Sequence, residues 1–316
     1  MTYFRSLEEM IGNTPMLLMN EHKTAGPLLL AKLDFQNLGG SSKDRIALSM
    51  IENAERKGFL KKGYTIILPT SGNTGIGVAM LCAVRGYKAI FTIPDKVSRE
   101  KELIMRSFGA EVIRCPTNVA TSDPESYNSV AERLSKEIYN SYLMDQYSDE
   151  SNPMAHYLTT GPEIWTDTDG NITHFVCGIG TGGTITGVGK YLKEKNPNIK
   201  IIGVDPQGSL YSHRFYGKEG DIHQYLVEGI GEDFIPSTLD MSVIDNIETV
   251  EDEEAFKMCR KIAKQKGLLI GGSSGAVLVA AQRVVQKCNE KAVVVVFLHD
   301  TGRNYINKIF TNRGIS

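Results

Sequence analysis

The sequence lacks a strong excess of charge of either sign. Its 316 residues include 35 lysine and arginine residues against 37 aspartate and glutamate residues, and the formal net charge is -2. Because the two signs are interspersed, the chain offers no basic surface for nucleic acid and no cationic segment for an anionic membrane. We therefore expect small-molecule or protein partners, with no nucleic acid and no membrane.

Metal-binding and disulfide patterns are missing as well. The five cysteines are scattered, odd in number and never arranged as C-x-x-C, so neither a disulfide framework nor a thiolate metal site is indicated. The six histidines include no H-x-x-x-H spacing, which argues against a histidine metal site. No apolar run approaches the length of a membrane span, and the N-terminus has no basic segment followed by an apolar run. We expect no metal and a cytoplasmic location.

What the sequence does contain is an alternation of apolar runs of strand length with segments of helical period. The expected strands cover 28–33, 65–68, 89–93, 111–114, 142–145, 174–177, 199–204 and 293–298. The expected helices cover 43–57, 74–84, 99–108, 129–139, 185–195, 252–266 and 275–287. This alternation predicts an α/β fold of open parallel sheets covered by helices on both faces.

The length of the chain favours two lobes, because 316 residues are too many for one small core. The polar stretch at 148–153 is typical of a connection between lobes, and 217–231 is expected to be an excursion outside the sheet. In open α/β folds, ligands bind at the carboxyl ends of strands. Loops of small residues at those ends are therefore the first candidates for a site.

The stretch at 39–45, Gly-Gly-Ser-Ser-Lys-Asp-Arg, places Lys43 where a glycine-rich loop becomes an amphipathic helix. Beside N–H groups and the positive end of a helix dipole, a lysine is a candidate amine nucleophile. Most lysines at a helix start are simply solvated, so this pattern alone leaves the ordinary interpretation open.

The loop 70–75, Thr-Ser-Gly-Asn-Thr-Gly, concentrates hydroxyl and amide side chains beside exposed helix N-terminal N–H groups. Such a loop is a receptor for a carboxylate or a phosphate. The alternative is an ordinary capped turn, with Ser71 or Asn73 as the cap. The segment 271–275, Gly-Gly-Ser-Ser-Gly, also precedes a helix, and there Ser273 or its neighbour fits a helix cap as well as a ligand role.

The loop 178–184, Gly-Ile-Gly-Thr-Gly-Gly-Thr, admits two interpretations. Its glycines let the backbone approach an anion, so it suits the single phosphate of a small cofactor. The same letters match the dinucleotide pattern G-x-G-x-x-G, with Asp205 as the ribose-binding acid, and an NAD(P)-dependent oxidoreductase is an alternative of another class. That alternative is weakened because the pattern begins past the middle of the chain and leaves Lys43 and the loop 70–75 without a role.

Together these motifs resemble one family. The lysine loop, the loop 70–75 and the glycine loop occur in the order found in the cysteine synthase and cystathionine β-synthase family of pyridoxal-phosphate enzymes, which have the tryptophan-synthase-like fold called fold type II. The similarity runs from Ile-Gly-Asn-Thr-Pro at 11–15 to the last expected strand and helix. It implies a smaller N-terminal α/β lobe at 45–150 and a larger cofactor-binding α/β lobe formed by 1–44 plus 151–316.

The resemblance assigns a role to each matching residue. Lys43 is similar to the lysine that forms the Schiff base with pyridoxal 5'-phosphate, Asn73 to the residue that hydrogen-bonds the ring oxygen, and Ser273 to the partner of the pyridine nitrogen. The residues that resemble the phosphate cup are Gly180, Thr181, Gly182, Gly183 and Thr184. The residues that resemble the substrate site are Thr70, Ser71, Gly72, Thr74, Gln146 and Gly229.

The implied reaction is a β-replacement through an aminoacrylate, catalysed by a lyase or transferase of cysteine metabolism. Lys43 removes the Cα proton as a general base, and the cofactor supplies the electron sink. A serine at the pyridine nitrogen would not hold that nitrogen protonated, which favours prompt expulsion of a β-substituent. The donor is serine, O-acetylserine or cysteine, and the acceptor is a thiol or sulfide. The alternative within this chemistry consumes cysteine and releases hydrogen sulfide, giving serine or lanthionine.

Several segments favour the cystathionine β-synthase branch of the family. These segments are 39–41, 145–147, 151–157, 228–236 and 303–305. Thr-Gly-Pro-Glu-Ile-Trp at 160–165 is instead the version usual in cysteine synthases, and Ser42 replaces the valine usual before the lysine. The resemblance also implies a homodimer, and we expect neither haem nor a response to S-adenosylmethionine.

Glu232 and Asp233 are candidates for an acid catalyst. Hydroxide is a poor leaving group, since bulk water has a pKa of about 15.7. If 229–236 covers the site as in the family, one of the two carboxylates can protonate the departing hydroxyl, or in reverse activate water for a reaction that starts from cysteine. The alternative is that both are solvated loop charges.

Overall fold

The computed structural model describes residues 3–20, 26–70, 72–120 and 123–311. The chain forms two compact units, one made of Met1–Ile11 with Lys43–Asn152 and the other of Gly12–Ser42 with Pro153–Ser316. The first residues thus belong with the unit that follows Lys43, where Arg85 Nε lies 2.6 Å from Glu8 Oε1. This grouping differs from the lobe of 45–150 that the sequence suggested.

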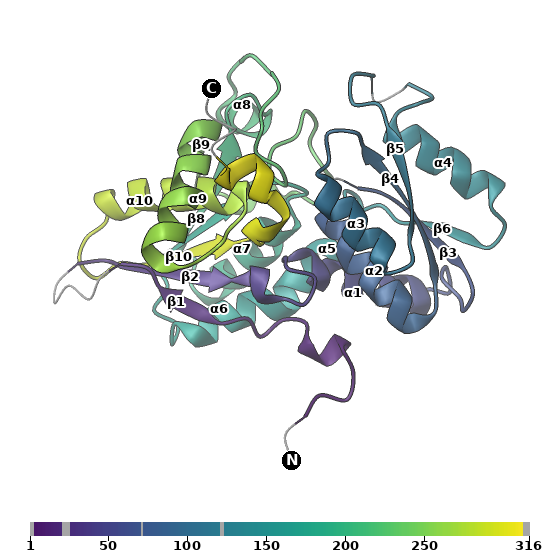
Figure 1. Ribbon diagram of the computed structural model, residues 1–316. Coiled ribbons are helices and arrows are strands. Elements are labelled where there is room, and N and C mark those ends of the chain that lie inside the picture. Colours follow the sequence, from purple (N-terminus) through teal and green to yellow (C-terminus); the bar gives the residue numbers. More distant parts are fainter. Residues whose placement is uncertain (1–2, 21–25, 71, 121–122, 312–316) are drawn as a thin grey trace. The chain divides into compact units, whose positions relative to one another are not determined.

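The first unit contains a four-stranded sheet in the order β5-β4-β3-β6, with all neighbouring strands parallel. The strands are β3 (Thr65–Pro69), β4 (Lys88–Pro94), β5 (Glu111–Cys115) and β6 (Ser141–Leu143). The helices are α1 (Lys43–Arg56), α2 (Asn73–Arg85), α3 (Arg99–Ser107) and α4 (Tyr127–Glu137). Helices α2 and α3 cover one face of this sheet, and α4 covers the other (Figure 1).

Burial explains why these segments form these elements. Strand β3 is central, and its run Ile66, Ile67 and Leu68 is fully buried, as expected for a parallel strand covered on both faces. Helix α3 begins where the Ser98 side chain accepts a hydrogen bond from the Lys101 N–H, and Ser126 caps α4 in the same way. Helices α3 and α4 therefore each begin at a local side-chain hydrogen bond and are stabilised by the packing of their buried faces.

The second unit contains a six-stranded sheet in the order β1-β2-β10-β7-β8-β9. The strands are β1 (Met16–Leu18), β2 (Leu28–Leu33), β7 (His174–Gly178), β8 (Lys200–Pro206), β9 (Asn246–Val250) and β10 (Val293–Leu298). All neighbours are parallel except β1 and β2, which pair antiparallel at the edge. The helices are α6 (Gly161–Asp167), α7 (Gly183–Lys195), α8 (Tyr211–Tyr216), α9 (Asp252–Lys266) and α10 (Gly272–Lys287). Helix α5 (Ser151–Ala155) contains the boundary between the two units.

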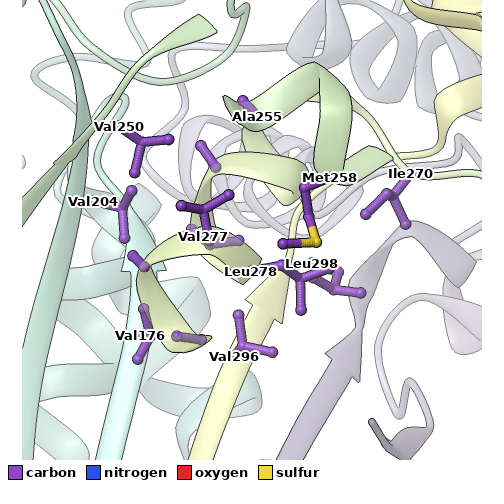
Figure 2. Packing of buried hydrophobic residues seen from close by; sticks show 14 of the residues in the cluster. Val176, Val204, Val250, Ala255, Met258, Ile270, Val277, Leu278, Val296 and Leu298 are labelled. Atoms are coloured by element: carbon purple, nitrogen blue, oxygen red, sulfur yellow. The ribbon is translucent and has the colours of Figure 1, made fainter. Parts of the chain in front are cut away.

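The core of the second unit lies on both faces of its sheet. On one face, buried strand residues such as Val176, Val204 and Val296 pack with Met258 of α9 and Val277 of α10 (Figure 2). On the other face, the alternate strand residues, which include Phe175, Cys177, Ile201, Val295 and Phe297, pack with α6 and α7. Successive residues of a strand point to opposite faces, so the uninterrupted apolar runs of β7 and β10 build both clusters.

The eight strands expected from the sequence are present, with ends shifted by a few residues. Strand β6 ends at Leu143, whereas the expected strand reached Asp145, and β8 continues to Pro206. The short strands β1 and β9, helix α8 and the helical stretch from α5 to α6 were not expected. The stretch 156–160 between α5 and α6 is a π-helical turn, so the polar segment at 148–153 leads into a helix.

Candidate active site

Lys43 is the first residue of α1 and is half-buried. The next residue, Asp44, is fully buried, and its Oδ1 lies 3.1 Å from the position that a Cβ on Gly77 would occupy. The absence of a side chain on Gly77 thus lets the first turn of α1 pack closely on the first turns of α2. As a result, Lys43 and Asn73 begin two helices that lie in contact within the first unit.

In the loop 70–75, the hydroxyl of Thr70 holds the backbone of two glycines. This oxygen accepts hydrogen bonds from the N–H groups of Gly72 and Gly75 at 3.1 and 3.3 Å, and Gly72 has a φ of 127°, which other residues rarely adopt. Gly72 is the N-cap of α2 and has no side chain of its own to cap the helix, while the Thr70 hydroxyl accepts from the N–H of Gly75 in the first turn. Asn73 is therefore the first helical residue and not a cap, while Ser71 lies outside the described residues. The start of α2 thus combines a glycine N-cap with backbone N–H donors, and a helix end of this kind binds anions.

Thr74 and Gln146 are joined by a hydrogen bond. The Thr74 hydroxyl donates to Gln146 Oε1 at 2.5 Å, and Asn152 Nδ2 donates to the Gln146 backbone carbonyl at 2.7 Å. The side chains of Thr74 and Gln146 are both buried. Because the Gln146 amide oxygen is occupied by Thr74, its amide nitrogen is the part of the side chain that can donate to a substrate carboxylate.

Lys101 is a residue near this loop that sequence reasoning missed. It lies on α3, is 1% exposed, and its Cδ and Nζ lie 2.4 and 3.4 Å from the position of a Cβ on Gly72. Lys101 shares the buried face of α3 with Met105, four residues later. This helical spacing was the signal in the sequence that could have identified Lys101 as buried. Lys101 therefore brings a buried positive charge up to the loop 70–75.

In the second unit, the loop 178–184 connects β7 to α7. Gly182, with a φ of 82°, is the N-cap of α7 and has no side chain of its own to cap the helix. A Cβ on Gly180 would lie 2.4 Å from the Gly229 carbonyl oxygen, and one on Gly182 would lie 2.5 Å from Leu239 Cβ. Neither position has room for a side chain, so the loop presents backbone alone at the start of a helix. A backbone loop in this position fits a phosphate group.

Thr181 and Thr184 line the same loop and are buried. The Gly183 N–H lies 3.5 Å from Thr181 Oγ1. Thr184 Oγ1 lies 3.1 Å from His156 Nε2, and His156 Nδ1 lies 2.9 Å from Thr160 Oγ1. The π-helical turn therefore brings a buried histidine against the last residue of the loop.

Ser273 lies in the first turn of α10, a helix whose N-cap, Gly271, provides no side-chain cap. The Ser273 hydroxyl is 3.4 Å from Asp300 Oδ1, and Tyr305 donates to Asp300 Oδ2 at 2.5 Å. Asp300 is 1% exposed and was missed from the sequence, although it follows β10 at the strand end where ligands bind. Ser273 therefore lies beside a buried carboxylate.

The residues that lead into Lys43 are fixed at the same end of β10. The Ser42 N–H donates to the His299 carbonyl and the Thr301 N–H to the Gly40 carbonyl, both at 2.9 Å. Ser41 also pairs with Asp300 as an isolated β-bridge. The backbone before the lysine is thus held by the strand end that carries Asp300.

Glu232 and Asp233 lie in the segment after Gly231, whose N–H donates to the Ile179 carbonyl at 2.7 Å. The Glu232 N–H donates to Ser209 Oγ at 3.1 Å, and Glu232 is half-buried, whereas Asp233 is exposed. Burial and these nearby carboxylates raise the pKa of the Tyr225 phenol. Gly229 has a φ of 87° and places its carbonyl against Gly180. The segment is therefore attached to the glycine loop by its backbone.

Asp205 is fully buried at the end of β8 and accepts a hydrogen bond from the Ser212 N–H at 2.9 Å. Burial raises the pKa of its carboxyl to about 6. A carboxyl in this position holds the start of α8 and is not exposed to a ribose, which counts against the dinucleotide interpretation.

The described residues include neither a metal-binding cluster nor a membrane-spanning helix. Residues 3–20, 26–70, 72–120 and 123–311 contain no group of three or more His, Cys, Asp or Glu side chains placed to hold a metal ion. In the same ranges, no helix combines the length and the apolar character needed to cross a membrane.

The similarity of the chain to a known family identifies its cofactor. The model of the family "Pyridoxal-phosphate dependent enzyme" matches residues 7–300. The chain belongs to this family. Pyridoxal phosphate is therefore its cofactor and the protein is an enzyme, as the sequence predicted, and the NAD(P)-dependent alternative finds no support.

Several known proteins are similar to this pyridoxal-phosphate enzyme in sequence and in fold. Cystathionine beta-synthase of Rattus norvegicus is 49% identical over 306 residues, which are 96% of this chain and 54% of that protein. The O-acetylserine dependent cystathionine beta-synthase from Helicobacter pylori superposes with a TM-score of 0.90 at 38% identity, covering 98% of this chain and 100% of that one. A hydrogen sulfide-producing enzyme from Fusobacterium nucleatum gives a TM-score of 0.89 at 39% identity, covering 96% and 100%. The predicted fold class and family are confirmed. The chain spans about half the length of the rat relative.

Proposed function

We propose that this enzyme catalyses β-replacement on serine, O-acetylserine or cysteine with a thiol or sulfide. The observation that carries the proposal is the close packing of the first turn of α1, which begins at Lys43, against α2, whose N-cap is a glycine. An amine next to an anion-binding helix end suits an α-amino acid, whose carboxylate is bound while its Cα proton is removed. The named activities of the rat and Helicobacter pylori relatives support the same assignment.

In the first unit, Lys43 acts as the general base. We assign Asn73 to the cofactor ring, and the substrate carboxylate to Thr70, Ser71, Gly72, Thr74 and Gln146. The start of α2 supplies N–H donors, and the Thr74–Gln146 hydrogen bond occupies the Gln146 amide oxygen, which leaves the amide nitrogen as a further donor. The Lys101 ammonium stabilises the bound carboxylate through charge. When bound, pyridoxal phosphate supplies the electron sink for the negative charge formed at Cα.

In the second unit, we assign residues 180–184 to the phosphate and Ser273 to the pyridine nitrogen. The bare glycine loop and the glycine N-cap of α7 support the first assignment. The Ser273 hydroxyl lies 3.4 Å from Asp300 Oδ1, and its single hydrogen is available to donate to an unprotonated pyridine nitrogen in place of this carboxylate. Gly229, beside Gly180, remains assigned to the substrate site.

A second candidate function is the cysteine-consuming reaction that releases hydrogen sulfide and yields serine or lanthionine. It is favoured by the similarity to the hydrogen sulfide-producing enzyme of Fusobacterium nucleatum. This reaction uses the same donor site and requires activation of water or of a second cysteine. Glu232 or Asp233 is the proposed acid or base for the step that involves water.

We also propose that the enzyme is cytoplasmic, as expected from the sequence, and that it is a homodimer, as the family resemblance implies. One chain has a mass of 34.8 kDa. Sedimentation equilibrium of the holoenzyme is expected to give twice this mass, and a mass of one chain at micromolar concentration would contradict the dimer.

The function is tested by supplying the holoenzyme with serine, O-acetylserine or cysteine, each with homocysteine or with sulfide, and identifying products by mass spectrometry. The proposal predicts a thioether or thiol product from at least one donor. Cysteine alone distinguishes the second candidate, because it predicts sulfide together with serine or lanthionine. Absence of β-replacement with every pair would refute both.

A further inference from the structure

Three consecutive peptide groups of the loop 178–184 are held by hydrogen bonds to their carbonyl oxygens. The Ile179 carbonyl accepts from the Gly231 N–H at 2.7 Å, as described above. The Gly180 carbonyl accepts from the Tyr211 hydroxyl at 2.6 Å, and the Thr181 carbonyl accepts from the Thr238 hydroxyl at 2.6 Å. All three donors belong to the chain that follows β8 in the second unit.

The direction of each carbonyl fixes the direction of the next N–H. In a trans peptide group the C=O of one residue and the N–H of the next point in opposite directions. The N–H groups of Gly180, Thr181 and Gly182 therefore point away from Gly231, Tyr211 and Thr238. Successive backbone N–H groups at a helix start bind anions, and the start of α7 follows directly.

The two hydroxyl donors are built into the core. Tyr211 is 0% exposed and Thr238 is 4% exposed. Burial raises the pKa of the Tyr211 phenol, so the hydroxyl keeps the proton that it donates. Asp205 accepts from the N–H of Ser212, the residue after Tyr211, and so anchors the start of α8.

We propose that Tyr211 and Thr238 are positioning residues that determine the affinity for the phosphate of pyridoxal phosphate. Their hydroxyl groups turn the peptide groups of the glycine loop so that its N–H groups face the phosphate. Without either hydroxyl, the corresponding peptide group is free to rotate and an N–H donor is lost. The inference rests on the proposed placement of the phosphate on residues 180–184.

The experiment compares two ligands of the apoenzyme, pyridoxal phosphate and pyridoxal, which lacks the phosphate. Tyr211→Phe and Thr238→Val remove the hydroxyl groups with little change in shape. Each is expected to raise the Kd for pyridoxal phosphate about tenfold, the worth of one charge-assisted hydrogen bond, and to leave the Kd for pyridoxal unchanged. Tyr216→Phe is the matched control, because Tyr216 lies on the same helix and donates to Asn246 Oδ1, away from the loop.

A pyridoxal phosphate Kd within twofold of the wild type in both hydroxyl variants overturns the inference. So does an equal weakening of pyridoxal binding, which indicates general loosening of the unit. Thr238→Val carries the test by itself if Tyr211→Phe does not fold.

Gly182→Ala separates the inference from the proposed phosphate site, since its positive φ and the contact with Leu239 force the loop to shift. If Gly182→Ala weakens pyridoxal phosphate selectively and the hydroxyl variants do not, the site stands and only the role of the hydroxyls is overturned. If Gly182→Ala changes neither Kd, the phosphate placement is wrong and the inference falls with it.

Discussion

Lys43 is the residue on which the proposed chemistry depends. Lys43→Ala removes the amine that takes the Cα proton, while the short side chain keeps α1 intact. Turnover is expected to fall about 10²–10⁴-fold, the usual contribution of a positioned base. The measurement is steady-state turnover with a saturating donor, with Lys57→Ala just beyond the far end of α1 as the control. Turnover within threefold of the wild type would exclude Lys43 as the base.

The carboxylates at 232 and 233 differ in exposure, and this difference makes their roles separable. A departing hydroxide needs a proton, whereas acetate leaves readily as the anion. Replacing the catalytic carboxylate by its amide, Asp233→Asn or Glu232→Gln, is expected to reduce serine-dependent turnover about 10²-fold or more and to spare O-acetylserine-dependent turnover. Ratios of kcat/KM for the two donors give the answer. Equal effects on both donors, in both variants, would eliminate the acid catalyst.

Asp205 makes stability depend on pH. Its pKa is raised by burial from 3.8 to about 6, so the native state keeps a proton that the unfolded chain has released. The stability that this proton contributes is fully present below pH 3.8 and is lost as the pH rises through 6. Asp205→Asn stays neutral, so its stability relative to the wild type should improve by up to about 3 kcal/mol between acid and mildly alkaline pH. Urea unfolding across this pH range tests the change, and a pH-independent difference would contradict it.

At the residue level, local patterns predicted the loops of the candidate site, because small residues at strand ends are visible in the sequence. Lys43, the loop 70–75 and the loop 178–184 were found in this way. Asp300 and Tyr211 were not, because their contacts join residues 27 and 31 positions apart. Such contacts exist only after the sheet has formed, and no local spacing indicates them.

At the element level, long and strongly patterned segments were predicted and short or polar ones were not. Strand β1 has three residues, and β9 lies at an edge and has only two apolar residues, Ile247 and Val250, among its five. The polar stretch at 148–153 suggested a connection between lobes, and the stretch from α5 to α6 also contains Pro162. Pro162 instead lies at the start of α6, where a proline costs the helix no hydrogen bond.

The contact of α7 with the π-helical turn at 156–160 depends on Gly187. A Cβ there would lie 2.1 Å from the Pro153 carbonyl oxygen and 2.8 Å from the Tyr157 nitrogen. Gly187→Ala must push these backbones apart, and it is expected to lower the free energy of unfolding by about 1–3 kcal/mol despite the better helix propensity of alanine. Denaturant unfolding measures the loss, with Lys195→Ala at the exposed end of α7 as the control. A stability equal to or above that of the wild type would show that the two helices have room to separate.

At the level of the whole molecule, the cofactor contributes to stability as well as to chemistry. A ligand that binds only the native state stabilises it by about 4 kcal/mol when its free concentration is 1,000 times its Kd. Removal of pyridoxal phosphate is therefore expected to lower the Tm by several degrees, and readdition should restore it. Identical scanning calorimetry profiles for the apoenzyme and the holoenzyme would contradict specific binding to the folded chain.

The sequence also predicted the architecture of the whole molecule, since its alternating strand and helix patterns gave parallel sheets covered by helices. It did not predict that the first residues join the unit that follows Lys43. Within that unit, the Arg85 guanidinium group forms ion pairs with Glu8, Glu52 and Glu55. An ion cluster of residues so far apart in the chain has no local pattern.

The most direct test of the central claim is to locate the lysine that binds the cofactor. Borohydride reduction of the holoenzyme fixes pyridoxal phosphate on the amine to which it is attached, and mass spectrometry of a digest identifies the modified peptide. The account predicts modification on Lys43 alone, and its loss in Lys43→Ala. Modification of a different lysine, or of none, would contradict the proposed site.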